Sequence, residues 1–174
     1  MDTVTATSPT AATASTPPAP GELWPGQGGR YICMLLPSHG MPLRALVVSD
    51  AEAPSLPYGP YLNVPGADSK MDGRANTDSL LASGQKHPAA KWAREYTADG
   101  HADFYLPSQH DLLQALWHAP HIFSKDGWYW SSTQLSRDVA VVQDFEGGDS
   151  YWNDKGDDYR VRAFRAIPLE LLNP

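Results

Sequence analysis

The chain has 174 residues, a length that fits one ordinary domain with a tail. Its 13 lysine and arginine residues against 20 acidic residues give a formal net charge of −7, which argues against nucleic acid and anionic membrane surfaces as partners. Cys33 is the single cysteine, so an intrachain disulfide and a cysteine-based metal cluster are excluded. No window approaches the roughly 20 apolar residues that a membrane span requires, so membrane insertion is not expected.

The first 23 residues differ in composition from the rest. Thr, Ala, Ser and Pro dominate residues 1–20, which have neither a basic start nor an apolar run of signal-peptide length. Such a composition buries too little surface to offset chain entropy, so residues 1–23 are predicted to be a flexible arm before a domain at 24–174. An alternative interpretation is an arm that becomes ordered against a partner subunit.

The first half of the domain is predicted to contain a β-hairpin followed by an irregular connection. Two apolar runs, Tyr31–Leu36 and Leu43–Val48, flank a turn rich in Pro and Gly. Residues 51–73 are rich in Pro, Gly, Asp and Ser, which predicts a long connection without regular structure.

Short helices are predicted next. One begins at Asn76 and ends at Gly84, and a second begins at Pro88, a residue that suits the first helical position. A third follows Ser108, which forms the pattern of a capping box with Asp111 in place of glutamate.

Strands dominate the prediction for the last part of the chain. They cover Trp128–Thr133, Val139–Phe145 and Tyr159–Ile167, and Trp128 and Trp130 share one face that is expected to fill the core. Because hairpin, helices and strands follow one another rather than alternate, the pattern indicates an α+β domain.

Several short motifs in the second half resemble a known family. They occur in this order: Asp72-Gly73-x-x-Asn76-Thr77, Pro88-Ala89-Ala90, Gly100-x-x-Asp103-Phe104-Tyr105-Leu106-Pro107-Ser108, Trp128-Tyr129-Trp130-Ser131-Ser132-Thr133, Asp144-Phe145-x-Gly147 and Val161-Arg162-Ala163-Phe164-Arg165. Over residues 70–167 they are similar to a domain-of-unknown-function family found in phage and prophage proteins and at the C-terminus of a bacterial collagen-like adhesin.

The resemblance implies a C-type-lectin-like fold used for ligand binding. With the patterns above, this means an N-terminal β-hairpin, two or three short helices and a β-rich C-terminal half. It also implies a virion-associated protein, made in the bacterial cytoplasm without a signal peptide, whose ligand face lies near the C-terminal strands.

The loops between the last strands hold the candidate binding residues. Tyr and Trp give a large contact area at low entropic cost, and Asn, Ser and Asp add adaptable hydrogen bonding. The candidates are Gln134, Ser136, Asp149, Tyr151, Trp152, Asn153 and Asp157. A second interpretation is that 149–158 is a solvated acidic loop with Trp152 folded inward. Arg162 and Arg165 are expected to pair with carboxylates of the acidic segment 144–158.

One motif suggests calcium binding. Trp152-Asn153-Asp154 matches the triplet that calcium-dependent C-type lectins carry before their final strand, and its oxygens suit calcium, but the usual upstream ligand loop is missing. A calcium-dependent sugar-binding lectin is therefore an alternative, while the main expectation is no metal and no cofactor.

Catalytic chemistry is not expected. The oxidases that share the fold use paired cysteines, and the chain lacks a nucleophile elbow, a zinc-binding His-Glu-x-x-His helix and a Walker loop.

Three hypotheses follow from the sequence. The first is a non-enzymatic adhesion module that binds a cell-surface glycan or protein through its C-terminal loops. The second is a tail or capsid decoration protein that docks on other virion subunits, or on further copies of itself, through the arm. The third, an enzyme, lacks a catalytic constellation to support it.

Overall fold

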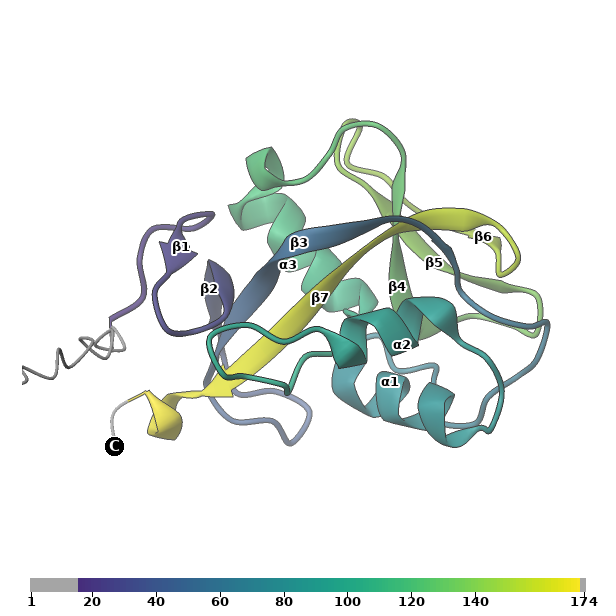
Figure 1. The fold of residues 1–174 in the computed structure, drawn as a ribbon, viewed down its shortest axis with the longest axis horizontal. Helices are drawn as coiled ribbons and strands as arrows, with labels where there is room; N and C mark the ends of the chain where they lie inside the picture. The colour runs from purple at the N-terminus through teal and green to yellow at the C-terminus, as the bar shows by residue number, and fades with distance from the viewer. Residues whose placement is uncertain (1–15, 173–174) are drawn as a thin grey trace, which may run out of the picture.

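The computed structural model describes residues 16–172, so residues 1–15 of the predicted arm lie outside the described part (Figure 1). The domain begins before residue 24. The backbone N–H of Gly21 donates to the Tyr31 carbonyl oxygen at 2.8 Å, and the Trp24 side chain is fully buried. Residues 21–23, predicted as part of the arm, therefore belong to the folded domain.

One mixed sheet organises the fold. Its strands are β1 (Leu23–Trp24), β2 (Gly29–Leu35), β3 (Arg44–Pro57), β4 (Trp128–Gln134), β5 (Val139–Asp144), β6 (Ser150–Asp154) and β7 (Asp158–Pro168). Their spatial order is β1-β2-β3-β7-β4-β5-β6, and only the β4–β7 pair is parallel. The last strand therefore lies in the middle of the sheet, between the N-terminal strands and the group β4–β6.

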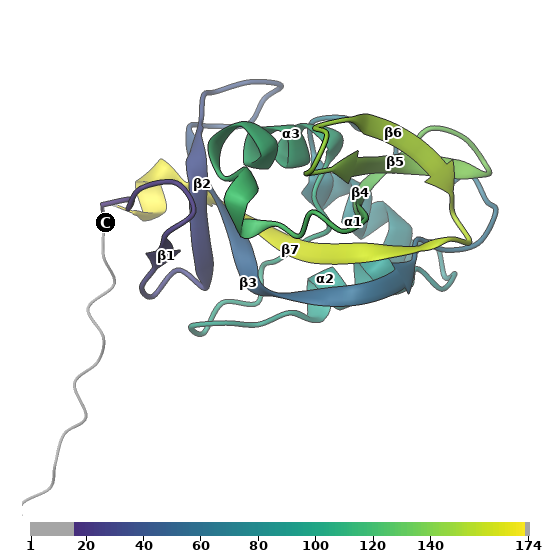
Figure 2. The same ribbon diagram turned by 90° about the horizontal axis from the view of Figure 1, so that it is seen from above.

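Helices cover both faces of the sheet, as Figure 2 shows for α3 on one side of β7 and α2 on the other. They are α1 (Gly73–Ala82), α2 (Pro88–Glu95) and α3 (Gln109–His118), with 3₁₀ turns at Pro120–Ile122 and Leu169–Leu171. Neighbouring residues of β7 point to opposite faces: Ala163 joins the core under α1 and α2, and Phe164 joins the core under α3. Within residues 16–172, no helix is long and apolar enough to cross a membrane.

The α+β class and the predicted N-terminal hairpin are confirmed. β2 and β3 pair antiparallel, with Tyr31 opposite Val47. The prediction of irregular structure from residue 51 was wrong for its first part, because β3 continues to Pro57 along β7. A register shift between Ala53 and Leu56 accommodates the unfavourable composition of this part of the strand.

The helix predictions hold, with one boundary moved. α1 begins at Gly73 rather than Asn76, because the Asp72 side chain caps it by accepting a hydrogen bond from the Ala75 N–H at 2.9 Å. α2 begins at Pro88 as predicted, and both hydrogen bonds of the capping box at the start of α3 are present.

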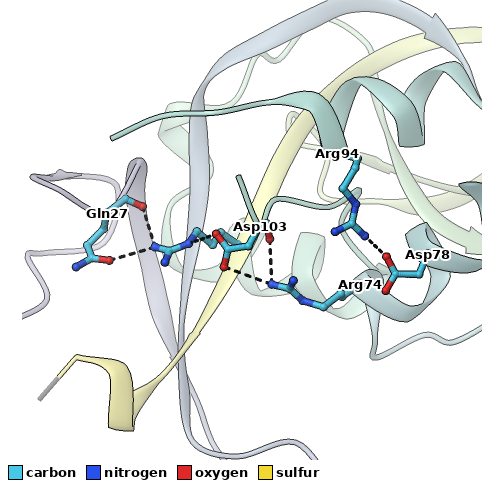
Figure 3. A network of polar contacts seen from close by, with 6 residues as sticks. Gln27, Arg74, Asp78, Arg94 and Asp103 are labelled. Carbon is cyan, nitrogen blue, oxygen red and sulfur yellow. Dashed lines mark hydrogen bonds and ion pairs between the residues drawn. The ribbon is translucent and has the colours of Figure 1, made fainter. Parts of the chain in front are cut away.

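Arg162 and Arg165 of β7 do not pair with the acidic segment 144–158, so that prediction was wrong. Arg165 Nε donates to Asp103 Oδ1 at 2.6 Å, and Arg162 donates to the backbone carbonyls of Ser49, Asp50 and Ile122. Figure 3 shows Asp103 beside the guanidinium of Arg74, whose Nη2 lies 3.6 Å from Asp103 Oδ2. The arginines therefore join β7 to neighbouring segments. Their role is structural, as predicted, but their partners are Asp103 and backbone carbonyls rather than the carboxylates of 144–158.

Asp111 gives the fold a pH dependence that can be measured. Burial raises the pKa of its carboxyl from 3.8 to about 6, while hydrogen bonds from Ser108 oppose the rise. The folded state thus holds this proton more tightly than the unfolded state. The stability from this group is complete below about pH 3.8 and is lost as the pH rises through about 6. In the wild type, Asp111 lowers the free energy of unfolding as the pH rises from 4 to 7. Asp111→Asn should remove this contribution, which is roughly 2–3 kcal/mol.

Urea unfolding at several pH values between 4 and 7 measures this difference. Asp126→Asn is the control, because it removes an exposed carboxylate outside any cap. A pH profile of Asp111→Asn that coincides with that of the wild type would contradict the assignment.

Candidate functional site

The segment that was predicted as a binding loop is an edge strand. Residues 150–154 form β6, which pairs antiparallel with β5 from Val139–Asp154 to Gln143–Ser150. Its composition is mixed, since Tyr151 and Trp152 favour a strand while Asn153 and Asp154 disfavour it. Pairing with the apolar β5 therefore sets its conformation.

Two aromatic side chains of β6 lie on the surface. Tyr151 and Trp152 are each 51% exposed, and their rings stack with centroids 4.7 Å apart and planes 9° apart. Trp128 lies beside them, with its ring centroid 6.3 Å from that of Tyr151. The interpretation of a loop with Trp152 folded inward was therefore wrong.

Further exposed apolar side chains lie on the segments next to β6. The described residues include nine exposed large hydrophobic side chains, and five of them form what we call the aromatic surface: Tyr61, Leu62, Leu135, Tyr151 and Trp152. Contacts between the segments hold this surface together, since the Tyr61 hydroxyl donates to Asp154 Oδ1. The sequence analysis missed Tyr61 and Leu62, which lie in the region predicted as an irregular connection.

A buried lysine joins the three segments that carry the aromatic surface. Lys155 is fully buried, and its Nζ donates to the Leu62 carbonyl at 2.8 Å and to Gln134 Oε1 at 3.1 Å. The ammonium also lies 5.3 Å from the centroid of the Tyr58 ring. Burial lowers the pKa of Lys155 from 10.5 to about 8.

Two of the candidate residues, Gln134 and Ser136, lie at the end of β4 and in the turn before β5. Gln134 is buried, and its side-chain amide donates to the Val64 carbonyl and accepts from the Val64 N–H, so it is a structural residue rather than a ligand contact. Ser136 is exposed, but its Oγ accepts hydrogen bonds from the backbone N–H groups of Asp138 and Val139. It therefore closes the turn before β5.

The remaining polar candidates flank the aromatic pair. Asn153 is partly buried and its Nδ2 donates to the Tyr159 hydroxyl at 2.9 Å, and that hydroxyl donates to Asp157 Oδ2 at 3.3 Å. Asp149 is exposed at the start of the strand, where its backbone carbonyl accepts from the Asp144 N–H. Asp149 and Asp157 thus place carboxylates at the two ends of β6.

The predicted calcium triplet is engaged in contacts within the protein. Asp154 Oδ1 accepts from the Tyr61 hydroxyl and from the Gly156 N–H, and the first of these contacts lowers the pKa of Asp154. The same hydrogen bond raises the pKa of Tyr61. Across residues 16–172, no group of three His, Cys, Asp or Glu side chains is placed to hold a metal ion.

The comparisons with known proteins give a distant structural likeness. No protein-family model and no curated protein matches the chain. Among solved structures, a fimbrial protein from Bacteroides ovatus ATCC 8483 matches with a TM-score of 0.52 and 14% identity, over 69% of this chain and 35% of that one. The chain thus spans about a third of the length of that protein, and at this identity the likeness concerns the fold alone.

The tie made by Lys155 predicts a local effect on the aromatic surface. In Lys155→Met the Leu62 carbonyl and the Gln134 side chain lose a shared donor, so the segment 58–64 should open more often. Amide hydrogen exchange in this segment should accelerate by about tenfold. Lys91→Met on the exposed face of α2 is the control. Equal protection of residues 58–64 in the two variants would refute the role given to Lys155.

Proposed function

We propose that the chain is a non-enzymatic adhesion module that binds a cell-surface ligand through the aromatic surface. The observation that carries this proposal is the stacked Tyr151–Trp152 pair, half exposed on the edge strand β6. Exposed aromatic side chains on a rigid strand lose little conformational entropy when they bind a partner. Exposed apolar side chains gathered in one place are typical of an interaction site.

The chemistry of the aromatic surface favours a glycan over a protein as the ligand. The faces of Tyr151 and Trp152 offer apolar contact to the C–H face of a sugar ring, while the carboxylates of Asp149 and Asp157 at the strand ends accept hydrogen bonds from hydroxyl groups. A protein ligand would also use the aromatic contact, and it is the second outcome of the binding test below.

The finer fold and the setting are part of the same proposal. A C-type-lectin-like fold is supported by the position of Leu135, Tyr151 and Trp152 on the C-terminal strands and the turns that join them. With the phage and prophage resemblance of the motifs, this supports a virion-associated protein made in the bacterial cytoplasm. The likeness to part of a fimbrial protein supports only the α+β architecture.

Removal of the aromatic pair should abolish adhesion. In Tyr151→Ala/Trp152→Ala, the main contact area is lost, so affinity for bacterial cells or for the bound glycan should fall by roughly a hundredfold. The melting temperature should hardly change, because both side chains are half exposed. Binding is measured on cells and on a glycan array with the purified full chain, and protease treatment of the cells separates a protein ligand from a glycan.

Trp117→Ala is the matched control for this experiment. Trp117 is 73% exposed but lies on α3, outside the aromatic surface. Its removal should leave binding intact. Normal adhesion by the double variant would show that the aromatic surface is not the binding site.

Calcium should not be needed for binding. The Asp154 carboxylate already accepts hydrogen bonds from Tyr61 and Gly156, and the Asn153 side-chain amide is held by Tyr159. Thermal melts and cell-binding assays with and without EDTA should therefore coincide. A melting temperature that falls in EDTA and recovers with added calcium would instead favour the calcium-dependent lectin.

A further inference from the structure

A second candidate site lies where the start of β3 and the end of β7, two neighbouring strands in the middle of the sheet, meet the start of α1. It is a cavity of about 180 Å³ lined by the side chains of Met41, Arg44, Met71, Arg74, Tyr105 and Pro168, among others. A cavity of roughly 150 Å³ accepts a molecule such as benzene. The space therefore fits a small organic molecule rather than a polymer.

Arg44 is the unusual group in this cavity. Its side chain is 5% exposed, and it donates a hydrogen bond to the Pro42 carbonyl oxygen at 3.1 Å. No described carboxylate forms an ion pair with it. A guanidinium has five N–H donors, and a buried charge without an ion pair is costly, so a carboxylate placed here would be held strongly.

Tyr105 supplies a second unused donor. The residue is 3% exposed, and within residues 16–172 its hydroxyl forms no hydrogen bond. Burial raises the pKa of Tyr105 well above 10, so the hydroxyl keeps its proton and remains a donor. Arg44 and Tyr105 thus line one cavity, and apart from the bond from Arg44 to Pro42 their side-chain donors form no hydrogen bond within residues 16–172.

The other charged groups of the cavity are already engaged. Arg74 donates to the Asp103 carbonyl oxygen at 2.9 Å and points toward that residue in Figure 3. Asp72 caps α1 through the Ala75 N–H, and Asp111 accepts from Ser108 in the capping box. These two carboxylates therefore have hydrogen-bond partners of their own. The Arg44 guanidinium acts on Asp111 from beyond ion-pair distance, where it opposes the rise of the Asp111 pKa, and within residues 16–172 it forms no ion pair.

We propose that this cavity binds a small carboxylic acid in its ionised form, with Arg44 and Tyr105 holding the carboxylate and the methionines contacting a short apolar body. The ligand class follows from the donors and from the apolar side chains of Met41, Met71 and Pro168. This site is separate from the aromatic surface, and the proposal does not depend on the adhesion function.

Titration calorimetry with the full chain tests the site, using butyrate and benzoate as probes and their amides as neutral controls. The carboxylates should bind at least about tenfold more tightly than the amides, because the amides cannot form the ion pair with Arg44. The Arg44 Nε–H resonance in a nitrogen-15 NMR spectrum should shift on binding, while that of the exposed Arg137 should not. Equal binding of acid and amide, or no binding of either, would overturn the proposal.

Two variants test where the ligand binds, so that the test still holds if one of them does not fold. Tyr105→Phe removes one hydroxyl and should weaken butyrate binding about threefold to tenfold, while Tyr96→Phe, outside the cavity, should leave it unchanged. Arg44→Met should weaken it by roughly tenfold to a hundredfold, with Arg137→Met as control. If Arg44→Met does not fold, the wild-type comparison and Tyr105→Phe decide. Unchanged affinity in Tyr105→Phe, or in a folded Arg44→Met, would refute the assignment.

Discussion

The end of the molecule that carries the aromatic surface depends on one buried charge. The Lys155 ammonium lies in the interior and forms no ion pair within residues 16–172. Its attraction for two oxygen acceptors and the Tyr58 ring offsets its loss of water. Because the acceptors come from the segment before α1 and from the end of β4, this contact fixes both segments against the turn after β6. The backbone carbonyl of Lys155 adds hydrogen bonds from the N–H groups of Tyr58 and Gly59. Tyr61 and Leu62, which belong to the same segment, are therefore placed by a group that never reaches the surface.

The two halves of the sheet meet at β7, and the arginines of this strand extend the connection beyond the sheet. β7 pairs antiparallel with β3 over most of its length, but it meets β4 in parallel at a single register pair, Tyr129 with Arg160. Arg160 reaches across to Glu52, while Arg165 reaches Asp103 in the connection before α3. Because these contacts lie in or beside the sheet, β7 joins parts of the chain that are far apart in sequence.

Features that depend on neighbouring residues were predicted well from the sequence. The capping box of Ser108 and Asp111, the start of α2 at Pro88 and the hairpin of β2 and β3 all follow from local patterns, and all are present. Trp130 was expected in the core, where it is fully buried and donates to the Leu56 carbonyl. Trp128, expected beside it, is only partly buried.

Features that depend on distant contacts were not predictable. The strand β6 is held by its pairing with β5, and the composition of 150–154, two aromatic residues among Ser, Asn and Asp, does not reveal that partner. Tyr61 meets Asp154 across 93 residues of sequence, and Arg165 meets Asp103 across 62. Gln134 was proposed as a ligand contact because it was assigned to the loop after the predicted strand Trp128–Thr133, but it ends β4 and its amide is matched by the backbone of Val64 inside the protein. Residue type alone does not distinguish a polar side chain with a buried partner from one that faces solvent.

The position of β6 at the edge of the sheet separates the exposed side chains of this strand from the requirements of folding. Four of its five residues are exposed, whereas the residues at the centre of β5, to which it is bonded, are buried. Backbone hydrogen bonds to β5 hold the strand in place, and these bonds do not depend on which side chains point outward. Tyr151 and Trp152 are therefore free to change during evolution without loss of the core. Related chains can therefore differ at a few positions on one short strand while the rest of the sequence stays under selection for stability.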